Sequence, residues 1–90
     1  MPGKRIGKAV ELLRAGDWEG AHVIAQAEDV CRENPPLAYW AHAIVHQIEG
    51  DEPNARYWYR RAEREFPGME AIDAEIDALD ARNRAAAPAP

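Results

Sequence analysis

The sequence predicts an all-α protein, and three observations lead to this prediction. Four breaks divide the chain into five segments, at Gly16-Asp17, Pro35-Pro36, Gly50-Asp51 and Pro67-Gly68. Between the breaks the good helix formers Ala, Glu, Arg, Leu and Gln are abundant. No segment alternates apolar and polar residues with period two, and β-branched residues are few. We therefore expect five helices with short connections, over residues 4–15, 18–33, 36–49, 52–66 and 69–84.

A glycine that can end a helix and an aspartate that can cap the next one separate the first two predicted helices. Ile6, Val10 and Leu13 lie on one face of the first helix. Gly16 stands where a residue in the left-handed conformation commonly ends a helix. Asp17 can cap the second helix, because its carboxylate accepts bonds from backbone N–H groups that have no partner in the first turn. These residues predict a short turn between the two helices.

The third and fourth predicted helices repeat this arrangement. Pro36 can open the third helix, because a first-turn N–H group has no helical partner to lose. Gly50 can end the third helix and Asp51 can cap the fourth. Pro53 falls in the first turn of the fourth helix. The third helix also carries a broad apolar stripe, made of Leu37, Trp40, Ala41, Ile44 and Ile48. Together with the first helix, this stripe forms either covered core, which we favour, or an exposed groove for a peptide.

The fifth predicted helix has one apolar face and one acidic face. Its apolar residues are Met69, Ile72, Ile76 and Leu79, at spacings of three, four and three. This pattern predicts a helix that caps the end of a helical stack. The alternative is that the stripe forms the seam of a homodimer, because helical arrays usually need about three repeats for stability. The predicted domain covers residues 1–84, and the Ala and Pro residues at 85–90 predict a flexible tail.

A repeat of about 34 residues relates the two halves of residues 4–67. It relates Gly16-Asp17 to Gly50-Asp51, Ala9 to Ala43 and Ala21 to Ala55. The second unit reads Tyr39-x-x-His42-Ala43-x-x-His46, then Gly50-Asp51, then Ala55-x-x-x-Tyr59-x-x-Ala62 and Pro67. Residues 4–67 therefore resemble the tetratricopeptide-repeat family, whose helix–turn–helix units have this period. The resemblance implies a short right-handed superhelix that serves as a non-catalytic interaction or scaffolding module for a protein or peptide partner.

Three histidines are the main candidates for a chemical site. His42 and His46 are four residues apart, so they share one face of the third helix, at positions where the tetratricopeptide family has leucine and tyrosine. A hairpin of the second and third helices would set His22 level with His46 or Gln47. Such a cluster could hold zinc, act as a general base or line a small-ligand pocket. The alternative, which we favour, is that the histidines are structural and that the protein has no catalytic residue, metal or cofactor.

Side chains around the histidines could also recognise a partner. Antiparallel packing of the third and fourth helices would set His46 near Tyr57 and His42 near Arg61. Trp40 is the expected apolar anchor, since aromatic side chains dominate many interfaces. The full set of predicted partner-binding residues is His22, Trp40, His42, His46, Gln47, Tyr57 and Arg61.

Composition and charge disfavour several classes of partner. The net charge of −5 argues against nucleic acid and anionic lipid, because both need a basic field. No apolar run approaches the roughly 18 residues of a membrane span. Cys31 is the single cysteine and cannot form an internal disulfide, which favours a reducing cytoplasm. Residues 16–62 also resemble a group of small bacterial proteins, and this resemblance implies a bacterial origin.

Overall fold

The computed structural model describes residues 4–86 and is built from six helices in that range. In chain order they are α1 (Lys4–Arg14), α2 (Trp18–Ala25), α3 (Glu28–Glu33), α4 (Pro35–Glu49), α5 (Glu52–Arg61) and α6 (Ile72–Ala86). No strand occurs among these described residues, so the predicted all-α class is confirmed. Within the same range, every helix is too short or too polar to cross a membrane.

Two of the predicted turns form as the sequence indicated. Gly16 (φ 80°) and Gly50 (φ 86°) adopt the left-handed conformation, which a side chain would strain. The residue after each glycine caps the next helix. Oδ1 of Asp17 and Oδ1 of Asp51 each accept a hydrogen bond from the backbone N–H three residues later, at 3.0 Å and 3.3 Å.

The single helix expected over residues 18–33 is interrupted, and this prediction was wrong. Gln26 ends α2, and Ala27 is extended, with φ −66° and ψ 136°, before α3 begins. The short α3 packs on α4 and buries Val30. The Cys31 thiol donates a hydrogen bond at 3.3 Å to the carbonyl oxygen of Ala25, which satisfies an acceptor at the end of α2. Neither Gly nor Pro marks the break, so the sequence carries no local signal for it.

A third left-handed turn ends α5 at Arg61, earlier than the expected residue 66. Glu63 has φ 57°. Its N–H donates to the carbonyl oxygen of Arg60 at 3.0 Å, and the N–H of Arg64 donates to that of Tyr59 at 3.0 Å. The same pair of bonds closes α1 and α4 at their glycines. Residues 62–71 then form an irregular connection to α6.

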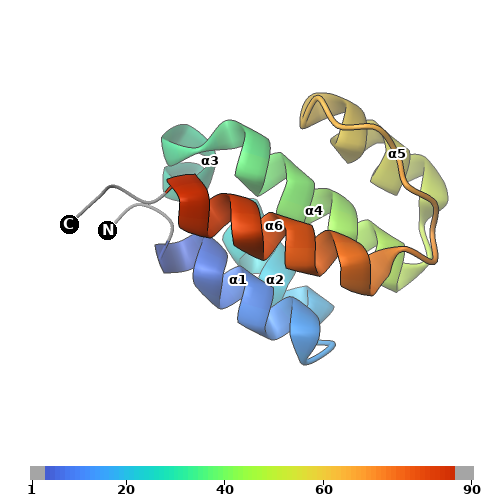
Figure 1. Ribbon diagram of the computed structural model, residues 1–90, viewed down its shortest axis with the longest axis horizontal. Helices are drawn as coiled ribbons and strands as arrows, with labels where there is room; N and C mark the ends of the chain where they lie inside the picture. The colour runs from blue at the N-terminus through green and yellow to red at the C-terminus, as the bar shows by residue number, and fades with distance from the viewer. Residues whose placement is uncertain (1–3, 87–90) are drawn as a thin grey trace.

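The last helix, α6, differs from the expected cap in its ends and in its position. It begins at Ile72 instead of residue 69 and continues to Ala86, so residues 85 and 86 of the predicted tail belong to it. Residues 87–90 of that tail lie outside the described residues. Figure 1 shows α6 running alongside α1 and α4, and it packs against both helices. It therefore covers the face that the first helices of the two hairpins share.

The apolar stripes of α4 and α6 belong to one core. Ile76 and Leu79 are buried in the same cluster as Trp40 and Ile44 of α4 and Val10 of α1. The stripe of α4 is thus covered within the chain, as favoured above. The alternative of a homodimer seam rested on Met69, Ile72, Ile76 and Leu79. Two of these four are core residues, so intramolecular packing accounts for the stripe that suggested the dimer.

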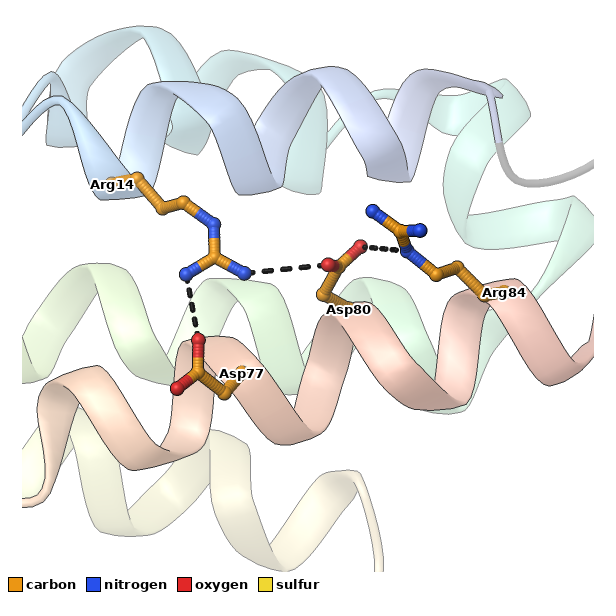
Figure 2. A network of polar contacts seen from close by, with 4 residues as sticks. All are labelled: Arg14, Asp77, Asp80 and Arg84. Atoms are coloured by element: carbon orange, nitrogen blue, oxygen red, sulfur yellow. Dashed lines mark hydrogen bonds and ion pairs between the residues drawn. The ribbon is translucent and has the colours of Figure 1, made fainter.

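Two polar networks fasten α6 to its neighbours. The buried carboxylate of Glu75 accepts hydrogen bonds from Nε1 of Trp40 at 3.0 Å and from Nε of Arg64 at 2.9 Å. The guanidinium carbon of Arg64 also lies 3.9 Å from the centre of the Trp40 ring. Figure 2 shows the second network, in which Arg14 of α1 reaches two carboxylates of α6 at the surface.

Candidate functional site

Three histidines from two helices lie together, and we call them the histidine cluster: His22 of α2, and His42 and His46 of α4. Nε2 of His22 lies 3.0 Å from Nε2 of His42, so one nitrogen donates its hydrogen to the other. One ring nitrogen from each residue lies within 4.8 Å of the other two. The sequence set His22 level with His46 or Gln47, and the structure brings its ring against both His42 and His46, at 4.6 Å and 5.7 Å between ring centres.

The helical framework explains why these rings meet. One turn of α4 separates His42 from His46, and the two rings stack with centres 5.0 Å apart. The helix that carries His22 packs across α4. Ala21 and Ala25 of that helix are fully buried, and their small side chains let the two helices approach closely.

His42 is the most buried member of the cluster. Its ring stacks on Trp58 of α5, with centres 3.9 Å apart and planes 13° from parallel. Burial, and after it the nearby His22 and His46, lowers the pKa of His42 to about 3. The pKa of His22 is also lowered, first by burial and then by His46. Both imidazoles are therefore neutral near pH 7, and each has one nitrogen lone pair to offer.

Acidic residues border the cluster beside His46. Nδ1 of His46 lies 2.9 Å from Oε1 of Glu49, the last residue of α4. His46, Glu49 and Asp51 also have potential ligand atoms within 4.8 Å of one another. However, the Asp51 carboxylate accepts bonds from the backbone and side-chain nitrogens of Asn54, at 3.3 Å and 2.7 Å. Asp51 therefore serves as the cap of α5, and Glu49 is the acid that contacts a histidine.

Trp58 belongs to the site, and the sequence analysis did not name it. The prediction set Tyr57 near His46 and Arg61 near His42, whereas the structure stacks Trp58 on His42. Residues equally far from the turn of a helical hairpin lie opposite each other, and this rule applied to the Gly50-Asp51 turn sets His42 opposite Tyr59, the residue next to Trp58. The i, i+3 spacing of His46 and Glu49 is likewise a signal that was available in the sequence.

Tyr57 and Arg61, two of the predicted partner-binding residues, are exposed on α5. Arg61 donates a hydrogen bond to the hydroxyl of Tyr57 at 2.9 Å, and its guanidinium carbon lies 4.7 Å from the centre of the Tyr39 ring. The ring of Tyr57 meets that of Trp58 edge-on at 5.1 Å. These residues thus form a surface beside the histidine cluster.

Trp40 and Gln47, two other predicted partner-binding residues, are buried and hold the fold together. Trp40 packs in the core and donates to Glu75. Gln47 accepts a hydrogen bond from the hydroxyl of Tyr59 at 2.6 Å and donates one to the carbonyl oxygen of Gly68 at 2.8 Å. The amide of Gln47 thereby ties the connection before α6 to α4 and α5. Burial removes both side chains from the surface that a partner would meet.

The cluster has ligand types that suit zinc, and the spacing of its nitrogens is compatible with zinc. Zinc takes histidine nitrogens at about 2.0–2.1 Å in a tetrahedral arrangement, which sets neighbouring ligand nitrogens about 3.4 Å apart. The two Nε2 atoms of His22 and His42 lie 3.0 Å apart, close to this value, and the ring nitrogen of His46 lies within 4.8 Å of both rings' nitrogens. The hydrogen between His22 and His42 would have to move to Nδ1 of the same ring, which is the other tautomer of neutral imidazole. Three histidines then leave a fourth position for water.

Comparisons of the chain with protein-family models, with curated proteins and with solved structures found no match. The resemblance to tetratricopeptide repeats stays a prediction. The histidine cluster is the feature of the molecule from which a function can be inferred.

Proposed function

We propose that the protein binds one divalent transition-metal ion of the zinc class at the histidine cluster. The observation that carries the proposal is the convergence of three imidazoles from two helices, with a ring nitrogen of each within 4.8 Å of the others. Imidazole nitrogen suits zinc, copper and nickel, whereas magnesium and calcium select oxygen ligands. The all-nitrogen set therefore favours the zinc class over the alkaline-earth ions.

The framework around the cluster supports the proposal. Two of the three ligands are one turn apart on α4, the helix at the centre of the packing. The ring of His42 is further held by its stack on Trp58. Ligands whose rotamers are locked by packing keep the geometry that a metal needs. Metal binding would therefore require little further ordering of the histidine side chains on α4.

A bound ion would join α2 to α4. The helix α2 has 8 residues and is followed by the break at Ala27, so its position depends on packing. An ion that binds the folded chain and not the unfolded chain stabilises the fold by mass action. The proposal therefore links metal binding to stability. It concerns binding and assigns no reaction.

The interaction role that the tetratricopeptide resemblance implies is a separate prediction. The face expected to form its groove is covered by α6, and its expected anchor Trp40 is buried. Tyr57 and Arg61 retain the exposure that a partner would need. We place metal binding ahead of this role, because the histidine cluster supplies a defined set of ligands.

Zinc titrated into untagged protein, in competition with a chromophoric chelator, tests the proposal. We expect saturable binding of one ion per chain. His22→Gln removes the ligand from α2 and should weaken binding about tenfold or more. Glu70→Gln, which changes an exposed acid outside the cluster, should leave the affinity unchanged. Unsaturable binding by the wild type, or equal affinity of the wild type and His22→Gln, would contradict the proposal.

A further inference from the structure

We infer that Glu49 is a positioning residue of the proposed metal site, which fixes the tautomer of His46 so that Nε2 of this ring binds the ion. The inference rests on the proposed metal-binding function and adds a residue that orients a ligand without touching the metal. Its basis is the 2.9 Å contact between Nδ1 of His46 and Oε1 of Glu49.

This hydrogen bond decides which nitrogen of His46 has the lone pair. An ionised carboxylate only accepts hydrogen bonds, so Nδ1 must carry the hydrogen that it donates to Glu49. A neutral imidazole has a single N–H, and Nε2 is therefore left as the acceptor. His22 and His42 also meet through their Nε2 atoms. Once the hydrogen between His22 and His42 has moved to Nδ1, all three histidines can offer the same ring nitrogen to the ion.

The position of Glu49 suits this task. It lies three residues after His46, on the same side of the last turn of α4, and Gly50 ends the helix directly afterwards. The side chain of His46 is 12% exposed and that of Glu49 is 35% exposed, so the pair lies between the cluster and solvent. A carboxylate bonded to the far nitrogen of a ligating histidine orients the ring and makes its other nitrogen more basic.

Zinc affinity measured for two variants of Glu49 tests the inference. Glu49→Ala removes the acceptor and should lower the affinity about 10- to 100-fold, the effect typical of residues that support metal ligands. Glu49→Gln keeps an oxygen that can accept from Nδ1, so it should recover part of this loss. The matched control is Glu70→Ala, an exposed acid on the connection before α6, which should bind as the wild type does. Equal affinities of the wild type and Glu49→Ala would overturn the inference.

Two spectroscopic readouts separate positioning from other roles. Cobalt(II) bound at saturation should show the same visible band shape in the wild type and in Glu49→Ala, because the ligands are unchanged. A different band shape would make Glu49 a direct ligand and overturn the inference. Nitrogen NMR of the metal-free wild type should find His46 protonated at Nδ1, and protonation at Nε2 would overturn it as well.

These outcomes distinguish the two proposals. A wild type that does not bind zinc refutes the metal site itself. A wild type that binds zinc as tightly as Glu49→Ala does refutes only the role of Glu49. The NMR measurement needs no variant, so it decides the tautomer even if Glu49→Ala folds poorly.

Discussion

Two polar clusters involve α4, and they differ in what completes them. The carboxylate of Glu75 is matched by Arg64 and Trp40, so charge and hydrogen-bonding groups balance within the chain. The histidine cluster instead gathers three bases, and beside the effect of burial, charge on His46 lowers the pKa of both His22 and His42. The first cluster balances its charges within the chain, whereas the second offers nitrogen lone pairs to the cation that we propose. A cluster of like bases therefore favours cation binding, although its members also hydrogen-bond to one another and to Glu49.

Breaking the Glu75 cluster should have the largest effect on stability. Arg64→Ala leaves the Glu75 side chain, which is 9% exposed, without its cation. Loss of one partner of a buried pair costs about 3–5 kcal/mol, and the 37% exposure of the Arg64 side chain sets the expected loss at the lower end of this range. Urea denaturation measures the loss of unfolding free energy. Zinc affinity should not change, and a parallel loss of affinity would contradict the separation of the two clusters.

Zinc should stabilise the protein through the histidine cluster. At a free concentration one hundred times Kd, binding to the folded chain adds about 2.7 kcal/mol to the unfolding free energy. The zinc-dependent rise should persist in Arg64→Ala and fall to about 1.4 kcal/mol or less in His22→Gln, whose affinity is about tenfold weaker or more, as measured by urea denaturation with and without the ion. An equal rise in His22→Gln would place the bound zinc at another site.

The turns show which parts of the fold the sequence could predict. Gly16 and Gly50 predicted two left-handed turns, because glycine adopts this conformation without strain. Glu63 makes the third such turn, where the conformation costs roughly 1–2 kcal/mol for a residue with a side chain. The connection that follows this turn, residues 62–71, is held at Gly68 by a hydrogen bond from Gln47 of α4. Local helix and turn propensities do not predict such a contact. They do not predict the position of α6 either.

The sequence likewise predicted part of the histidine cluster and missed the rest. Helical spacing placed His42 and His46 on one face, and the hairpin brought His22 to them. The sequence could not tell that α2 stops after Ala25, nor how its packing on α4 sets the distance between rings. Trp58 was missed because the prediction paired His42 with Arg61, which lies three residues after Trp58 on α5.

Acid should weaken the Glu75 cluster by a smaller amount. Burial raises the pKa of Glu75, but hydrogen bonds from Arg64 and Trp40 outweigh burial and hold the pKa below its ordinary value of 4.5. A carboxyl with a lowered folded-state pKa stabilises the fold above its unfolded pKa, and this contribution is lost as the pH falls through the folded pKa. Wild-type stability relative to Glu75→Gln should therefore decline below about pH 4.5. A difference in unfolding free energy that stays constant between about pH 3 and 7 would contradict the role of the charge.

The network in Figure 2 should contribute least, although it also joins α6 to its neighbours. Arg14 donates to Asp77 at 2.7 Å and to Asp80 at 3.3 Å, and Arg84 donates to Asp80 at 3.2 Å. Water and salt screen these exposed charges, and such pairs add little to stability. Arg14→Ala should therefore lower the unfolding free energy far less than Arg64→Ala, and the loss should shrink further in about 1 M salt, where the screening length is about 3 Å. If the two losses were equal, burial could not be what distinguishes the Glu75 cluster from a surface ion pair.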